Sequence, residues 1–199
     1  GGSWYRSDMF MRSAHRSNYS PSGRTISVGF RLSLQKVPHV VELNSTVSLE
    51  MIWVEPGTFT MGSPESEANR STDETQHEVT ISEGFYLGKY EVTQGQFEAV
   101  TGTNPSNWNW MGADNPVEQI NMTNLASFIN TLNQSQRDAG NLENGWQYVL
   151  PTEAEWEYAC RAGSTTAYHW GTDINQSKAR YGTGTPTSVG SFSPNAWGF

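Results

Sequence analysis

The segment LPTEAEWEYACRAG, residues 150–163, restricts the fold of this chain more than any other stretch. Thr152 and Glu155 form the T-x-x-E pattern of a capping box, in which each side chain accepts a hydrogen bond from a backbone N–H at the start of a helix. Gly163 supplies the stop, because glycine readily takes the left-handed conformation that ends helices. The pattern predicts a short helix with both ends fixed.

Two more helices are expected. Thr93 begins the pattern T-x-x-Q before QGQFEAV, and Gly102 ends this helix. The other helix is expected after Thr123, where apolar residues recur at the spacing i, i+3, i+4 and i+7 of one helical face. The residues of this apolar stripe are Leu125, Phe128, Ile129 and Leu132.

The remaining apolar segments are short and alternate with polar residues, which favours strands. Strands are predicted at 25–32 (TISVGFRL), at 51–54 and 58–61 around a Pro-Gly turn, and within VTISEGFYLGKYEV. The acidic stretch SPESEANRSTDETQHE is expected to be a surface loop. Residues 164–199, rich in Gly, Ser, Thr and Asn, are expected to be irregular with short strands. The sequence therefore predicts an α+β protein with few helices, short strands and long ordered loops.

Charge and composition argue against several classes of partner. The net charge is -8 and no block of Lys and Arg occurs, whereas nucleic acids and anionic membranes bind basic surfaces. No apolar run approaches the roughly 18 residues that a membrane-spanning helix needs, so we expect no membrane insertion. Aromatic residues make up 12% of the 199 residues, which is typical of a folded domain and not of a disordered chain.

Four stretches together resemble one protein family. They are MIWVEPGTFTMGS (51–63), GFYLGKYEVTQGQF (84–97), LPTEAEWEYACRAGS (150–164) and SVGSFSPNAWGF (188–199). In this order they resemble the body of the formylglycine-generating-enzyme (sulfatase-modifying factor) family, and the opening GGSW…RSAHR…GFRL resembles the end of the same domain. The resemblance covers nearly the whole chain outside a connector. It implies the family's variant of the C-type lectin-like fold.

The order of the motifs predicts three parts. Residues 1–34 resemble the C-terminal segment of such a domain, which packs on the main body or belongs to a preceding copy. Residues 35–50 are expected to be a connector, and residues 51–199 a main body that lacks the GNVWEW-like stretch of the family at its C-terminal end. Two explanations of this rotated order stay open. The chain is either a window cut from a tandem array or a circular permutant that lacks one segment, and the abrupt ends favour the window. We also expect residues 25–32 to pair with the strands around 51–61, because the connector is long enough and an unpaired strand edge is a liability.

The oxidase chemistry of the family implies a copper site that this sequence does not match. The family holds copper with two cysteines after the GGS motif, and soft thiolates are ligands that Cu(I) prefers. The corresponding stretch WYRSDMFMRS has no cysteine, and Met9 and Met11 are better interpreted as apolar packing residues than as weak copper ligands. Cys160, the single cysteine, is expected to be a small buried residue on its helix.

The calcium sites that the resemblance implies are not matched either. One uses an Asn in the loop that corresponds to KARYGTG, where this chain has Arg180. The other draws on the missing GNVWEW-like segment, of which Asn195 would be only a remnant. The histidines lack the spacing of a zinc or iron site. His77 in ETQHEV matches a motif position of the family and is expected to be a hydrogen-bonding structural residue. We therefore expect neither copper nor calcium as a cofactor and no metal site.

The carboxylates of the helix after Thr152 allow one enzymatic alternative. Glu153 and Glu157 share a helix face with Glu155 between them, and paired carboxylates are the acid and base of glycosidases. Capping and the favourable interaction of acidic residues with the helix dipole explain them better.

The resemblance places one segment where a ligand would bind. In the family the residues after GGSW line the groove for the substrate peptide, and aromatic and Arg side chains suit recognition. The expected ligand-binding residues are Tyr5, Arg6, Asp8, Phe10 and Arg12. A structural role is an equal alternative for the first four, and it is favoured for Trp4, Arg16 and Arg31, with arginines paired to acidic residues such as Glu155 or Glu157.

These observations favour a domain of this family without the paired copper-binding cysteines. Its expected role is that of a non-catalytic module that binds a protein or a glycan, as one copy in a larger bacterial protein. The alternative is part of a sulfatase-modifying oxidase whose active-site segment lies outside this chain. The compartment stays open, with export to the periplasm or the cell exterior as one alternative.

Overall fold

The structure, a computed structural model, describes residues 31–34 and 40–199 of the chain. The strands are β1 (Ser33–Leu34), β2 (Val40–Glu42), β3 (Ser48–Val54), β4 (Gly57–Met61), β5 (His77–Ile81), β6 (Phe85–Gly88) and β7 (Tyr148–Val149). The helices are α1 (Gln94–Thr101), the 3-10 helix η2 (Asn109–Met111), α2 (Met122–Asp138) and α3 (Glu153–Arg161). Short antiparallel strands with few helices confirm the predicted α+β class.

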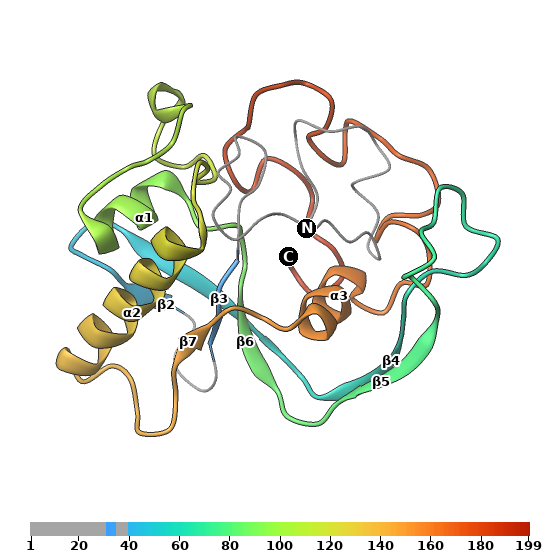
Figure 1. Cartoon of the computed structure of the whole chain (residues 1–199), viewed down its shortest axis with the longest axis horizontal. Coiled ribbons are helices and arrows are strands. Elements are labelled where there is room, and N and C mark those ends of the chain that lie inside the picture. Colours follow the sequence, from blue (N-terminus) through green and yellow to red (C-terminus); the bar gives the residue numbers. More distant parts are fainter. Residues whose placement is uncertain (1–30, 35–39) are drawn as a thin grey trace.

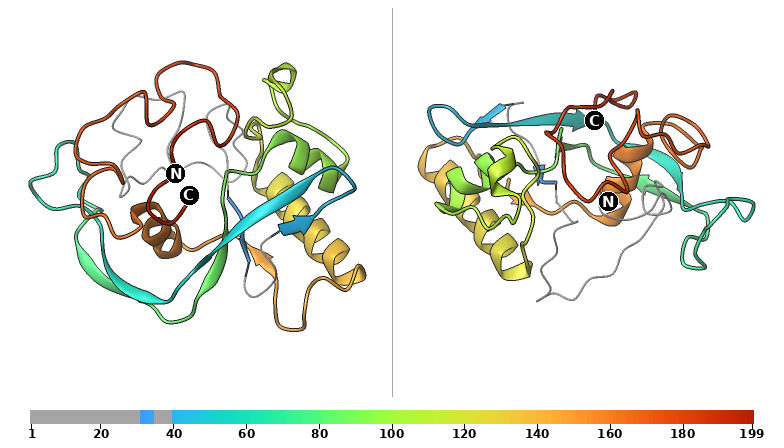
Figure 2. Two further views of the ribbon diagram at one scale, coloured as in Figure 1. Left: turned by 180° about the vertical axis from the view of Figure 1, so that it is seen from behind. Right: turned by 90° about the horizontal axis from the view of Figure 1, so that it is seen from above.

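The strands form two sheets that are connected by the same two segments of chain, β3–β4 and β5–β6. The larger sheet has the order β2-β3-β6-β1-β7, and β4 and β5 form a separate two-stranded sheet. Since β3 leads into β4 and β5 leads into β6, both sheets belong to one long twisted ribbon (Figure 1). Figures 1 and 2 show α1 and α2 together at one end of the molecule and α3 beside the β4–β5 ribbon at the other.

The pairing of β1 differs from the sequence-based prediction. Ser33 and Leu34 pair antiparallel with β6 on one side and with β7 on the other, and the carbonyl of Leu32 accepts a hydrogen bond from the N–H of Gly88. β6 therefore lies between this stretch and β3. The expected direct pairing of 25–32 with the strands around 51–61 is wrong at its described end, because β3 already pairs with β2 and β6. Residues 25–30 lie outside the described residues.

The helix boundaries follow from capping. Thr93 caps α1 together with Gln96, and Thr152 caps α3 together with Glu155, as the capping-box patterns predict. α2 begins two residues earlier than expected, since its N-cap is Asn121 and not Thr123. The Asn121 side chain accepts from the N–H of Asn124, whose side chain in turn accepts from the N–H of Asn121. An Asn at this third position satisfies the same donors as the Glu or Gln of the usual pattern.

Two hydrophobic clusters stabilise the two ends of the molecule. The larger one joins α1 and α2 to the five-stranded sheet, and within it the rings of Phe97 and Phe128 stack at a centroid distance of 5.2 Å. The smaller one, around Phe85 and Ala159, joins α3 to the strands beside it and includes the C-terminal residues Trp197 and Phe199. Burial of such apolar side chains is the main favourable term in folding.

Residues 164–199, all of which the structure describes, contain no strand, so the predicted short strands in this region are wrong. One isolated bridge joins Tyr168 and Gly171. The segment arches over α3 as a long ordered loop (Figure 1). Residues 40–50, predicted as part of a connector, contain β2 and the beginning of β3.

Candidate functional site

The sequence-predicted ligand-binding residues cannot be placed. Tyr5, Arg6, Asp8, Phe10 and Arg12 lie outside the described residues, as do Trp4, Met9, Met11 and Arg16. Arg31 is described. Burial raises the pKa of Glu91 above its ordinary value, and the positive charge of Arg31 opposes this shift. One set of buried polar groups gathers between α3 and the acidic loop that connects β4 to β5.

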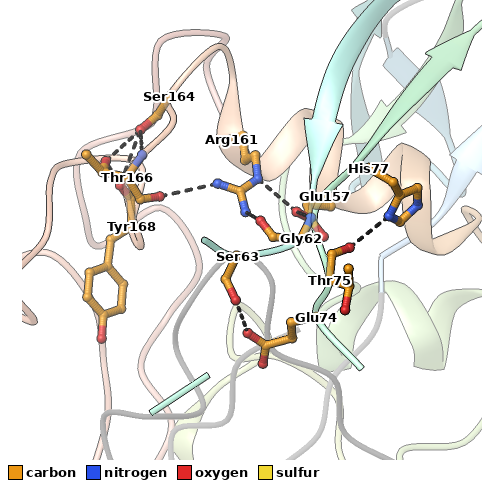
Figure 3. A network of polar contacts seen from close by, with 10 residues as sticks. All are labelled: Gly62, Ser63, Glu74, Thr75, His77, Glu157, Arg161, Ser164, Thr166 and Tyr168. Carbon is orange, nitrogen blue, oxygen red and sulfur yellow. Dashed lines mark hydrogen bonds and ion pairs between the residues drawn. The ribbon is translucent and has the colours of Figure 1, made fainter. Parts of the chain in front are cut away.

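An ion pair on α3 forms the centre of this polar network (Figure 3). Arg161 Nε donates to Glu157 Oε1 at 2.8 Å, and both side chains are buried. The same carboxylate oxygen accepts from the N–H of Gly62 at 2.8 Å, while Arg161 Nη2 donates to the carbonyl of Gly62 at 2.6 Å. One ion pair thus binds both backbone groups of a residue that follows β4.

The two ends of the acidic loop are tied together next to this ion pair. Ser63 donates from its N–H to the carbonyl of Glu74 and from its hydroxyl to Glu74 Oε2, both at 2.8 Å. Arg70 Nε adds a weaker bond to the Ser63 hydroxyl at 3.4 Å. His77 donates from Nδ1 to the carbonyl of Thr75 at 2.9 Å, which confirms its predicted role as a hydrogen-bonding structural residue.

Arg161 extends the network into the loop after α3. Its Nη1 donates to the carbonyl of Thr166 at 3.4 Å, and the Thr166 hydroxyl donates to the carbonyl of Tyr168 at 2.6 Å. The Tyr168 ring stacks on Trp170 at 5.1 Å. Burial, assisted by the charge of Lys178, lowers the pKa of the neighbouring His169 below its ordinary value. The network therefore joins α3 and the loop that follows it to the segment around Gly62, which is distant in the sequence.

The carboxylates of α3 are engaged in structural contacts. Glu155 Oε2 accepts from the N–H of Thr152 at 2.7 Å, which completes the capping box. Glu157 is fully buried against Arg161 and Gly62. The capping role expected for these carboxylates is confirmed for Glu155. A glycosidase acid or base must reach its substrate, and the buried carboxylate of Glu157 has no such access. The predicted pairing of Glu157 with the arginines of residues 1–30 lies outside the described residues.

Cys160 does not match a copper site. It is half-buried on α3, so the expected full burial is wrong, and the chain has no second cysteine. Its carbonyl accepts from Asn195 Nδ2 at 3.2 Å, as the carbonyl of Ala159 does at 2.8 Å. Cu(I) sites of paired soft thiolates need two cysteines, so the residues present do not fit that group. Arg161 points away from Cys160, as expected, because its guanidinium is bound to Glu157 and Gly62.

The two positions of the implied calcium sites are also occupied by other contacts. Arg180 donates from Nε to the carbonyl of Thr185 at 3.2 Å and from Nη2 to its hydroxyl at 2.9 Å. A cation is therefore already present where an Asn would supply a metal ligand, and a second cation would be repelled. Asn195 Oδ1 accepts from the N–H groups of Trp197 and Phe199 at 3.0 and 3.1 Å, which uses its oxygen to close the C-terminal turn.

Among the residues that the structure describes, no three His, Cys, Asp or Glu side chains come together as a possible metal site. In the same part of the chain, no helix is both long and apolar enough to cross a membrane.

Sequence reasoning missed a second polar cluster, around Glu118. This fully buried carboxylate accepts from the N–H of Trp108 at 2.8 Å, and the N–H of Glu118 donates to the Ser106 hydroxyl at 3.3 Å. Burial raises the pKa of Glu118, although backbone N–H groups of Trp108 and Asn107 oppose the shift. The only sign of this cluster in the sequence is one Glu beside apolar residues in NPVEQI. No local pattern predicts that this Glu contacts the loop that precedes it.

Comparisons with known proteins agree with the motifs. The family described as sulfatase-modifying factor enzyme 1-like domain (FGE-sulfatase) matches residues 38–199. The chain is 34% identical over 146 residues to the chaperone protein LppX of Paenibacillus barcinonensis, a match that covers 60% of this chain and 48% of the relative. The chain thus spans 48% of the length of this curated relative.

Two solved structures have a similar fold. Treponema denticola variable protein 1 aligns with a TM-score of 0.64 and 22% identity over 80% of this chain and 71% of that chain. PvdO from Pseudomonas aeruginosa aligns with a TM-score of 0.54 and 23% identity over 82% of this chain and 70% of that chain. At these identities the likeness concerns the fold alone.

Proposed function

Because this chain belongs to the family of sulfatase-modifying factor enzyme 1-like domains, we propose that it is a non-catalytic member that binds a protein or a glycan. The observation that carries this proposal is its single cysteine. Cys160 lies on α3, with its backbone held by Asn195 and no second thiol in the chain, whereas the copper chemistry of the family uses a thiolate pair. The fold is retained while the groups for the oxidation are not.

The described polar network supports a structural scaffold. Glu157, Arg161 and Glu74 are the charged groups most deeply buried near α3, and each makes hydrogen bonds within the fold. Buried charges are costly unless they are paired, so these residues hold the loops in place instead of remaining available for proton transfer. We propose further that the domain has no copper or calcium cofactor and that its fold is the family's variant of the C-type lectin-like fold.

The ligand is proposed to bind at Tyr5, Arg6, Asp8, Phe10 and Arg12. The similar LppX is named a chaperone protein, which favours a polypeptide over a glycan as the ligand. Large aromatic and Arg side chains are the residue types that dominate binding energy at protein interfaces.

Two measurements test this function. The copper-loaded chain is incubated with a cysteine-containing peptide, and we expect mass spectrometry to show no formylglycine. Binding to reduced, carboxymethylated α-lactalbumin is then measured by fluorescence anisotropy, with Tyr5→Ala and Phe10→Ala expected to weaken it and Val40→Ala, an exposed residue of β2, as the control. Formation of formylglycine would overturn the proposal, as would polypeptide binding that is equal in all four proteins.

A further inference from the structure

We propose that the loop between α1 and α2 carries a second binding site, which takes a neutral saccharide and is built on Trp108 and Trp110. Neither residue belongs to the segment of residues 5–12 on which the proposed function depends. The two tryptophans lie at the start and inside η2, in a segment that reaches away from both helices (Figures 1 and 2).

The aromatic surface is open to solvent. The Trp110 side chain is 71% exposed, more than any other large hydrophobic residue that the structure describes. Trp108 is half-buried beneath it, and the two rings meet edge to face at a centroid distance of 5.9 Å and an angle of 63°. The lower ring thus supports the upper one in an orientation that leaves one indole available to a ligand.

Three buried polar side chains hold the backbone of this loop. Glu118 accepts from the N–H of Trp108 at 2.8 Å, and Gln94 Nε2 donates to the carbonyl of Trp108 at 3.4 Å. Asn115 Nδ2 donates to the carbonyl of Met111 at 2.9 Å. Burying polar groups costs free energy, so their use on one irregular loop indicates that its conformation matters. A fixed loop loses little conformational entropy when a ligand binds.

The chemistry around the rings suits a neutral ligand rich in hydroxyl groups. Between Gly102 and Asp114 the only charged residue is Asp114 itself. The exposed polar residues of this stretch are Thr103, Asn107 and Asn109, which carry a hydroxyl and two amides, whereas Asn104 and Ser106 make hydrogen bonds within the fold. Amides donate and accept hydrogen bonds, as sugar hydroxyls do, while an indole offers a flat apolar face to the C–H groups of a pyranose ring. The net charge of -8 disfavours anionic ligands such as phosphates.

The size of the surface also favours a small ligand over a protein. A Trp side chain buries on the order of 150–250 Å² when it is covered completely. Two adjacent rings, one of them already half-buried, fall well below the roughly 800 Å² per partner of a stable protein interface. A short oligosaccharide with flat, equatorially substituted rings matches this area.

The test uses cellohexaose as the neutral probe and a hexamer of galacturonic acid as the anionic one. Indole N–H signals of the ¹⁵N-labelled chain are followed by NMR, and Trp110→Ala identifies the signal of Trp110. We expect cellohexaose to shift this signal and the galacturonic acid hexamer not to. Calorimetry should show affinity for cellohexaose lowered at least about tenfold in Trp110→Ala, and unchanged in Val40→Ala, whose residue is 47% exposed on β2.

Several outcomes would overturn the saccharide site. They are the absence of a shift with cellohexaose, equal affinity in Trp110→Ala, and equal binding of the anionic hexamer. A change in molar mass of the wild-type chain that Trp110→Ala abolishes, measured by light scattering, would identify a protein interface instead. Because Trp110 is exposed, its variant is expected to fold. If the wild-type chain bound cellohexaose but no polypeptide, the proposed function would be overturned and the saccharide site would be supported.

Discussion

Glu157 and Arg161 form a buried ion pair, with 2.8 Å between Oε1 and Nε, that binds both the N–H and the carbonyl of Gly62 (Figure 3). The two charged residues are one helical turn apart on α3, while Gly62 is 95 residues away from Glu157 in the sequence. This contact fixes α3 against the end of β4. It also removes both charges from solvent, so each depends on the other.

Replacing Glu157 by Ala is expected to lower the free energy of unfolding by about 3–5 kcal/mol, because it leaves the Arg161 charge buried without its partner. Urea unfolding followed by circular dichroism measures the change. Glu98→Ala, an exposed residue of α1, is the control and should change the free energy of unfolding by about 0.5 kcal/mol or less. Equal effects of the two substitutions would show that the ion pair does not stabilise the fold.

Gly62→Ala is expected to destabilise the chain more than Gly102→Ala. Both glycines have a positive φ, 100° and 75°, which costs an alanine about 1–2 kcal/mol. At Gly62 the added Cβ would also lie 2.7 Å from the carbonyl oxygen of Glu74, whereas at Gly102 it would meet nothing within 4 Å. The difference between the two unfolding free energies measures this clash. If Gly102→Ala were the more costly of the two, the close packing at Gly62 would be refuted.

The titration of Glu118 is expected to make stability fall as the pH rises above the ordinary pKa of a glutamate, about 4.3. Burial raises the pKa of this carboxyl in the folded chain. The folded state then binds the proton more tightly than the unfolded state, so the contribution is present below the ordinary pKa and is lost as the pH rises through the raised one.

Glu118→Gln removes this titration while keeping an acceptor for the N–H of Trp108. The unfolding free energy of the wild type relative to this variant should therefore decrease with rising pH, as measured by urea unfolding at several pH values. Glu98→Gln, an exposed residue of α1, controls for the loss of one negative charge. If the unfolding free energy of the wild type relative to Glu118→Gln increased with pH, the predicted direction of the pH dependence would be wrong.

Calcium is expected to have no effect on the thermal stability of the chain. The guanidinium of Arg180 already binds the carbonyl and hydroxyl of Thr185, so a divalent cation at this loop would meet a positive charge. Differential scanning calorimetry with calcium and with a chelator should give the same Tm, and Arg180→Ala should lower it. A Tm that rises with calcium would show that a calcium site exists despite Arg180.

Helix ends were predictable because capping is local. The Thr93 and Thr152 boxes involve residues three positions apart, and both form as expected. The start of α2 was missed because Asn124 takes the place of the usual Glu or Gln in the box with Asn121. For the candidate site, the role of Glu155 followed from its near neighbours, and that of His77 from a motif position of the family. The ligand-binding segment lies outside the described residues and stays a prediction.

Contacts between distant segments were not predictable in the same way. Nothing near Glu157 in the sequence specifies Gly62 as its partner, and nothing near Glu118 specifies the loop that holds Trp108. The place of β1 between β6 and β7 likewise depends on which strand edges are still unpaired once the sheet forms.

The sequence by itself determined the α+β class, the ends of α1 and α3, the family and the absence of a cysteine pair, because these depend on short patterns and on composition. The tertiary structure alone decided where Leu32 lies, which backbone the ion pair of α3 binds, and that Trp110 remains exposed above Trp108. The physical reason is that burial and hydrogen bonding join residues by distance in space, and a chain can satisfy one local pattern in many such arrangements.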